Sequence, residues 1–238
     1  RAITVAPVAL ATFFSLSAGA LLAFVVQTVM IGWDVVLRGF RGRWKLFMWL
    51  TAITYVTLDI LSNRTPFHLL VDYGTFSSKT AYYRIVIWRH GIDDVYRNPL
   101  FGLGNNIESW TRAFWMGSSI DNFWLFMAMK FGIPTFLTLA GAAIAVLWRA
   151  GRVEMPDPLD RACRTGWAIA FVGLMLAGGT VHYWTTMMSF FMFVLGAGVW
   201  MSSGGARTVA AEEAAGGRRR RRARTGAPAA EPVGRSPA

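Results

Sequence analysis

The sequence has few charged residues and a single cysteine, and both features limit the classes of protein to which it can belong. Only 16% of its 238 residues are charged, against about 25% in a typical soluble domain, while 54% are hydrophobic and 14% are aromatic. The single cysteine, Cys163, excludes an intrachain disulfide. Three histidines without a Cys/His cluster argue against a structural zinc site. The composition therefore predicts an all-α, polytopic transmembrane bundle and excludes the disulfide-rich and disordered classes.

Several apolar runs approach the roughly 20 residues that a helix needs to cross a bilayer. A break near Ser15 to Gly19 would separate a helix end from a full span, although one long tilted helix from Thr4 to Trp33 is the alternative. Gly132 and Pro134 predict a kink or break within a later run. Gly178 to His182 marks a turn in the last run, which is too long for one span. About five spans are predicted, near residues 1–12/17–33, 46–61, 122–148, 166–181 and 183–201.

The distribution of Arg and Lys predicts an orientation for these spans. The short basic loops are placed in the cytoplasm, and residues 62–121 form a long periplasmic loop, part helical and part irregular, whose charges nearly balance. Residues 203–238 contain eight Arg and three Glu among Ala, Gly and Pro, which predicts a disordered basic cytoplasmic tail. Its run Arg218 to Arg222 fits contact with anionic lipid better than nucleic-acid binding, because no nucleic-acid module accompanies it. The chain begins at Arg1 and runs at once into apolar sequence, so we expect an N-terminal half to be missing.

The polar, arginine-bearing stretch from Tyr82 to Pro134 stands out between the apolar runs. A guanidinium offers a planar fork to phosphate oxygens, so a group of arginines beside a bilayer predicts binding of a lipid headgroup or lipid diphosphate. The alternative for each arginine alone is snorkelling to the interface. The basic candidates for ligand contact in this stretch are Arg84, Arg89, His90, Arg97 and Arg112.

The same stretch holds the other candidate residues. Gly102 and Gly104 follow Asn98-Pro99 and allow close backbone approach to a ligand, although such a segment is more often only a turn. Asp121 is a candidate base, with Asn122 beside it, and one of the two can instead cap the helix that follows. Trp115, with Trp110 and Trp124, suits either sugar stacking or an aromatic belt. Lys130 is the one charge inside a predicted span, which marks it as a functional candidate unless it snorkels.

The order of these motifs resembles the O-antigen ligase/polymerase family of bacterial envelope glycosyltransferases. The resemblance rests on Arg84 with an aromatic residue three or four positions further on, on Asn98-Pro99-Leu100-Phe101-Gly102-Leu103-Gly104, on Asp121-Asn122, and on Phe131-Gly132-Ile133-Pro134. It implies a bacterial inner-membrane enzyme that acts at the periplasmic face on an undecaprenyl-diphosphate-linked oligosaccharide and a glycan acceptor, with no metal and no cofactor. It also implies that Arg84 binds the diphosphate and that polysaccharide assembly proteins are possible partners.

One departure from the family pattern bears on the activity. The ligase branch often has a histidine before the asparagine, where this chain has Asp121, so the resemblance favours an exopolysaccharide or O-antigen polymerase over a lipid A-core ligase. In the expected site, Arg84 and Asp121 are catalytic, and the residues that contact substrate are Arg89, His90, Gly102, Gly104, Arg112, Trp115 and Asn122. Two other functions remain open: a transporter or flippase of the same lipid-linked glycan, and a non-catalytic membrane scaffold.

Overall fold

The structure is a computed structural model, and it describes residues 10–12, 14, 18–40, 42–61, 78–155 and 157–202. These residues form helices and no strand, which confirms the all-α prediction. The helices are α2 (Ala18–Val36), α3 (Arg43–Leu61), α5 (Ser78–Arg97), α6 (Phe123–Phe131), α7 (Ile133–Arg152), α8 (Pro158–Ala177) and α9 (Thr185–Ser202), with a 3-10 helix, η1 (Gly104–Ser109). The break predicted near Ser15, the first part of the long loop and the basic tail lie outside the described residues.

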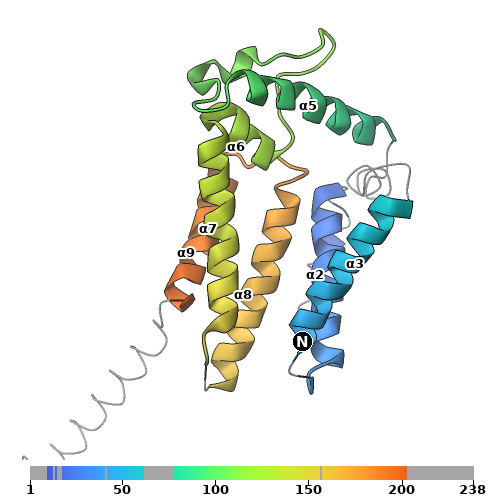
Figure 1. Ribbon diagram of the computed structural model, residues 1–238, viewed down its shortest axis with the longest axis vertical. Coiled ribbons are helices and arrows are strands. Elements are labelled where there is room, and N and C mark those ends of the chain that lie inside the picture. Colours follow the sequence, from blue (N-terminus) through green and yellow to red (C-terminus); the bar gives the residue numbers. More distant parts are fainter. Residues whose placement is uncertain are drawn as a thin grey trace, which may run out of the picture.

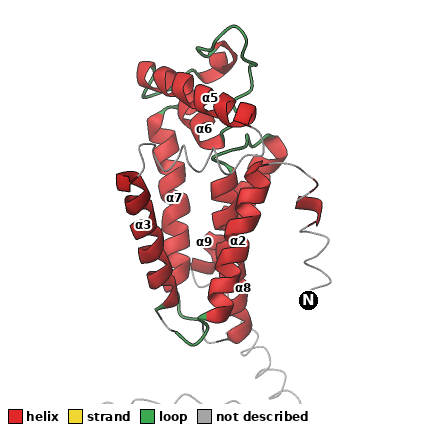
Figure 2. Ribbon diagram, turned by 90° about the vertical axis from the view of Figure 1, so that its right-hand side faces the viewer, coloured by secondary structure: helices red, strands yellow, loops and turns green. Residues whose placement is uncertain are grey.

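Five of the helices, α2, α3, α7, α8 and α9, stand side by side, and α5 lies across one end of them with α6 beneath it (Figures 1 and 2). Within the described part of the chain, α2, α3, α7 and α9 are long and apolar enough to cross a membrane. The neighbouring helix α8 carries Asp160, Arg161 and Arg164 in its first turns and packs against both α2 and α9. An integral membrane bundle is therefore the architecture that length, composition and packing together support.

Local sequence explains where the helices break. Gly132 adopts φ +86° and ends α6, and Pro134 then lies in the first turn of α7, where its missing N–H costs no hydrogen bond. The predicted break at Gly132 and Pro134 is thus confirmed. The predicted turn is also present, because α8 ends at Ala177 and α9 begins at Thr185.

An aromatic core joins α6 to α8 and α9. Phe123, Phe171 and Phe191 are completely buried, and the Phe171 ring stacks on Trp167 with 5.3 Å between centroids. Phe123 stacks on Tyr183, which lies in the turn between α8 and α9, at 4.8 Å. Because Phe123 is the first residue of α6, this core fixes where the N-terminus of α6 meets that turn.

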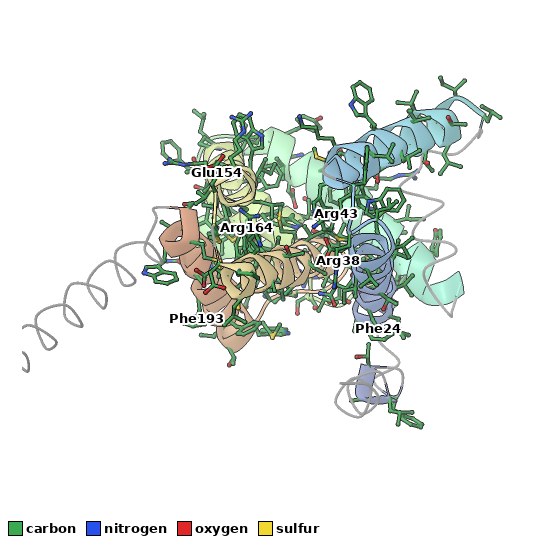
Figure 3. The ribbon with its side chains drawn as sticks, turned by 90° about the horizontal axis from the view of Figure 1, so that it is seen from below. Phe24, Arg38, Arg43, Glu154, Arg164 and Phe193 are labelled. Carbon is green, nitrogen blue, oxygen red and sulfur yellow. The ribbon has the colours of Figure 1, made fainter. Side chains whose placement is uncertain are left out.

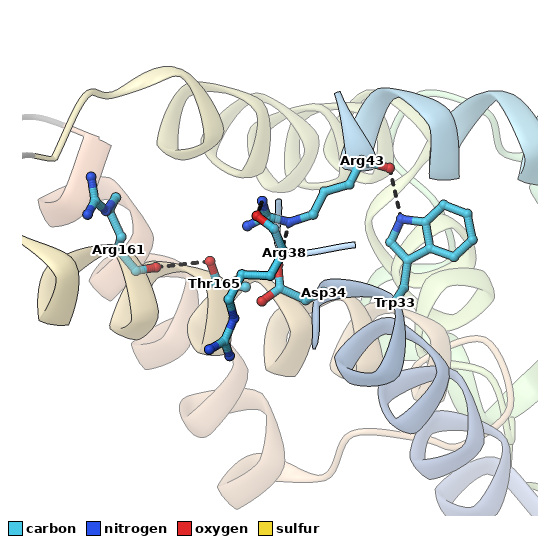
Figure 4. Close-up of polar contacts among 6 residues, drawn as sticks. All are labelled: Trp33, Asp34, Arg38, Arg43, Arg161 and Thr165. Atoms are coloured by element: carbon cyan, nitrogen blue, oxygen red, sulfur yellow. Dashed lines mark hydrogen bonds and ion pairs between the residues drawn. The ribbon is translucent and has the colours of Figure 1, made fainter. Parts of the chain in front are cut away.

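Helix α3 is held mainly at its first turn. Arg43 donates from Nε to Asp34 Oδ1 at 2.7 Å, and Trp33 donates from Nε1 to the Arg43 carbonyl at 2.8 Å (Figure 4). None of its described side chains is buried, although the helix is rich in Leu, Ile, Trp and Val. An apolar surface of this kind is unfavourable in water and suits the hydrocarbon of a bilayer.

The basic loops lie together at the end of the bundle opposite α5. Arg38, Arg43 and Arg164 appear on this end when it is viewed from below (Figure 3). The two loops that the charge pattern assigns to one side, between α2 and α3 and between α7 and α8, therefore do lie at one end.

Candidate functional site

The site is built on α5, whose apolar side faces α6. Ile87, Gly91 and Val95 are buried on this side. A Cβ added to Gly91 would lie 2.8 Å from the Leu125 and Met129 side chains, so the two helices cross with no room for a larger residue. Arg84 is two turns before Gly91 and therefore lies on the same side of α5.

Arg84 is half-buried at this crossing. Its Nε is buried and has no hydrogen-bond partner among the described residues. Burial lowers the pKa of Arg84 from its ordinary value, and the negative charge of Asp121 opposes part of that effect. A guanidinium stays charged even so. Arg84 therefore lies within electrostatic range of Asp121, another predicted site residue, and carries a buried Nε donor that no described residue satisfies.

The loop above α5 is fastened by polar contacts. Asp94, which is 4% exposed, accepts hydrogen bonds from the backbone N–H of Thr111 at 2.5 Å and from its hydroxyl at 2.7 Å. Trp110 is buried and donates from Nε1 to the Ser118 carbonyl at 3.1 Å. Asp94 was not among the residues singled out from the sequence, because an acidic residue on a polar helix gives no sign that it will be buried.

The other predicted basic residues are spread around this loop and helix. Arg89 is exposed, and His90 is half-buried with an Nδ1 that lacks a partner in the described structure. Arg112 is exposed and donates to the Glu108 carbonyl at 2.6 Å. The ring of Trp115, half exposed, lies 6.1 Å from that of Tyr83. Trp115 is thus close in space to Tyr83, the neighbour of Arg84 on α5.

The two glycine-containing motifs dock against each other through their backbones. Leu103 N–H donates to the Met129 carbonyl at 2.7 Å, and Ile133 N–H donates to the Pro99 carbonyl at 2.8 Å. Gly102, with φ +65°, has room for no side chain, because a Cβ there would lie 2.5 Å from the Met129 carbonyl oxygen. We call this contact between residues 99–103 and 129–133 the backbone latch.

The latch gives Gly102 and Gly104 different surroundings. Gly102 faces the α6–α7 break, and its N–H donates to the Asn98 carbonyl at 3.1 Å. Gly104 has φ +58° but open space where a Cβ would be. The positive φ of Gly102 and the lack of room for a side chain explain why a glycine is needed at this turn.

Asn122 caps α6, which leaves Asp121 free of that role. The Asn122 side chain accepts from Leu125 N–H at 2.9 Å and donates to the Gly179 carbonyl at 2.8 Å. Both of its polar atoms are therefore bonded to protein, and they tie α6 to the turn between α8 and α9. Asp121 accepts from the Ser119 hydroxyl at 2.7 Å.

A groove with a volume of about 540 Å³ opens beside Asp121. We call it the His182 groove. It is lined by η1, the loop before α6, one side of α6, the α8–α9 turn and the start of α9. Its polar and charged lining residues are Glu108, Ser118, Ser119, Lys130, His182, Tyr183, Thr185 and Ser189.

Lys130 and His182 share this groove with aromatic rings. The Lys130 ammonium lies 5.5 Å from the Phe126 ring centroid and 5.4 Å from that of Phe131. His182 lies edge-on to Phe126 and to Trp184, with centroids 4.4 Å and 4.7 Å apart. Burial lowers the pKa of His182, Asp121 acts in the opposite direction, and Lys130 lowers it further.

No local sequence pattern predicts that His182 lies near Asp121. The two residues are far apart in the chain, and contacts between distant segments, among them the bond from Asn122 to the Gly179 carbonyl and those from Phe123 N–H to the Gly178 and Val181 carbonyls, bring the turn to α6. The sequence did predict that Asp121 and His182 both lie at the outer ends of membrane spans, and this was the available sign that they could be near each other. The described residues contain no group of three or more His, Cys, Asp or Glu side chains placed to hold a metal ion.

Comparison with known proteins identifies a family. The family model described as O-antigen ligase matches residues 3–140, which is more than half of the chain and includes Arg84, the latch and Asp121. No curated protein and no solved structure matches. The chain therefore belongs to the O-antigen ligase family.

Proposed function

We propose that this protein is a membrane glycosyltransferase that extends or ligates an undecaprenyl-diphosphate-linked glycan at the periplasmic face, as a polymerase of exopolysaccharide or O-antigen type. Family membership supports the general activity, and the bundle supports a site in the membrane. The basic loops at the opposite end of the bundle support placing α5 outside, because Lys and Arg are retained on the cytoplasmic side.

The observation that carries the proposal is the half-buried Arg84 with an unpaired Nε beside Asp121. A hydroxyl of the acceptor glycan attacks the anomeric carbon of the donor, and the bond from that carbon to the diphosphate oxygen breaks. Negative charge grows on the departing oxygen. A guanidinium already fixed by packing stabilises that charge without reorganising, which is the condition for a large effect on rate.

The test is a membrane assay of chain elongation with a lipid-diphosphate-linked oligosaccharide. Arg84→Ala is expected to lower the rate by on the order of 10²–10³, the usual effect of removing one such contact. Arg84→Lys should also fail, because an ammonium cannot replace the planar fork. Arg161→Ala, an exposed arginine at the opposite end, is the matched control. Parental elongation by Arg84→Ala at normal expression would refute the role of Arg84.

Two further arms separate the alternatives. Elongation by purified protein in vesicles without an ion gradient distinguishes a transferase from a transporter. Asp121→Asn keeps a group that can accept from Ser119 but removes the charge beside Arg84 and His182. Because Asn122 is the cap of α6, loss of activity in Asp121→Asn reports on charge or proton transfer and not on helix capping.

A further inference from the structure

Ser119 lines the His182 groove and donates to Asp121, so the groove lies next to this carboxylate. Asp121 is close enough to act electrostatically on both Arg84 and His182. Arg84 is a fixed cation, suited to a leaving diphosphate, whereas His182 is a titratable group that lines an open groove. Resting on the function proposed above, we propose that the His182 groove binds the acceptor glycan and that His182 takes the proton of its attacking hydroxyl.

The shape and lining of the groove suit a sugar. Trp184 lines it and is 68% exposed, so one ring face is open to a ligand. Hydroxyls of Ser118, Ser119 and Ser189 line it as well. Aromatic surface with a few convergent polar groups is the usual composition of a small-molecule site.

The imidazole of His182 is held in place by packing. Phe126 and Trp184 both contact it edge-on, and its Nδ1 is buried without a partner in the described part of the chain. Nε2 is therefore the ring nitrogen that can meet a hydroxyl in the groove. The proposed step requires the neutral ring to react as the tautomer with its proton on Nδ1, since Nε2 then carries the lone pair that a base needs.

The charges around His182 favour the neutral ring. Burial and the Lys130 ammonium lower the pKa of His182, and Asp121 offsets part of this. Glu108 of η1 supplies a carboxylate to the lining of the groove, while the residues that α9 contributes, Thr185, Met188 and Ser189, carry no charge. The ring is therefore unprotonated at neutral pH and available to accept a proton.

The step balances as follows. The hydroxyl oxygen of the acceptor glycan bonds to the anomeric carbon as its proton passes to Nε2 of His182. The bond from that carbon to the diphosphate oxygen breaks, and its electron pair leaves with the lipid diphosphate beside Arg84. The imidazolium then releases its proton to water, which restores the base.

The experiment compares His182→Gln and His182→Ala with the parent protein in the elongation assay across pH. His182→Gln is expected to lose about 10²-fold or more at neutral pH, in the range for removal of a general base. The parent rate should fall as pH drops through the lowered pKa of His182, and this acid limb should be absent from the residual activity of His182→Gln. Added imidazole should restore part of the activity of His182→Ala. Arg161→Gln, at the far end of the bundle, serves as the control for expression and insertion.

Donor binding is measured in parallel by photo-crosslinking of a lipid-diphosphate analogue. It should be retained in both His182 variants and lost in Arg84→Ala. Parental activity in His182→Gln, or loss of activity with an unchanged acid limb and no imidazole rescue, would overturn the role of His182. Loss of elongation in Arg84→Ala with full activity in His182→Gln would leave the proposed function standing and remove only this inference. Full activity in both would refute the proposed function.

Discussion

The backbone latch predicts that two neighbouring glycines respond very differently to the same substitution. Gly102→Ala and Gly104→Ala both place a Cβ on a residue with positive φ, +65° and +58° respectively. That conformation alone costs an L-residue about 1–2 kcal/mol. The pair therefore forms a matched comparison in which backbone strain is nearly constant.

The difference lies in what the new methyl group meets. At Gly102 the Cβ would be 2.5 Å from the Met129 carbonyl oxygen and 2.7 Å from Gly132 N, whereas at Gly104 it meets nothing within 4 Å. Backbone atoms cannot rotate away as a flexible side chain can. The loop must shift, and the latch hydrogen bonds of Leu103 and Ile133 weaken. Each is worth about 1 kcal/mol, so Gly102→Ala should be less stable than Gly104→Ala by roughly 2 kcal/mol.

The assay is thermal unfolding of detergent-purified protein, followed by tryptophan fluorescence and by loss of the monodisperse species. For a chain of this size, 2 kcal/mol corresponds to a difference in Tm of roughly 4–8 °C between the variants. Equal Tm values would refute the steric reasoning. If Gly104→Ala also lost elongation activity while remaining folded, the loop after the latch would be implicated in ligand contact.

Two further predictions concern contacts that position the site. Asn122→Ala should lower Tm, because α6 loses a cap worth about 1 kcal/mol and the Gly179 carbonyl loses its donor. Asn122→Asp keeps the cap, so its Tm should fall between those of the parent and Asn122→Ala. Equal Tm values for Asn122→Asp and the parent would show that the bond to the Gly179 carbonyl contributes nothing to stability. A double-mutant cycle with Asp34→Asn and Arg43→Gln should give a measurable coupling energy of about 0.2–1 kcal/mol, since these partly exposed side chains form a single ion pair at 2.7 Å. A coupling energy of zero in the thermal assay would contradict this and would show that α3 is held by its aromatic contacts instead.

Much of the fold follows from apolar length and from Gly and Pro, and the helix ends show where that reasoning stops. The predicted spans end near charged residues, because charge is costly in hydrocarbon. The helices continue past them: α2 reaches Val36, α3 begins at Arg43 and α7 ends at Arg152. Charged residues outside the bilayer do not end a helix, so a helix can be longer than the membrane-spanning segment that it contains.

The sequence allows prediction of those site residues that a short motif identifies, but not of residues that distant segments bring to the site. Arg84 and Asp121 were identified from residue type and position, and they lie within electrostatic range of each other. His182 and the latch depend on contacts between distant segments, such as Asn122 with Gly179 and Ile133 with Pro99, and no local pattern encodes those pairings. Their roles in catalysis remain predictions to be tested by the variants above.

The latch has a consequence for how this protein can diverge. Its hydrogen bonds join main chain to main chain, so they survive almost any exchange of the neighbouring side chains, provided the two close-packed glycines persist. Residues 104–128 lie between the two segments of the latch, so the latch hydrogen bonds hold the two ends of this segment together. Replacing exposed side chains of that segment would change the surface beside the proposed acceptor groove while α5 stayed where it is.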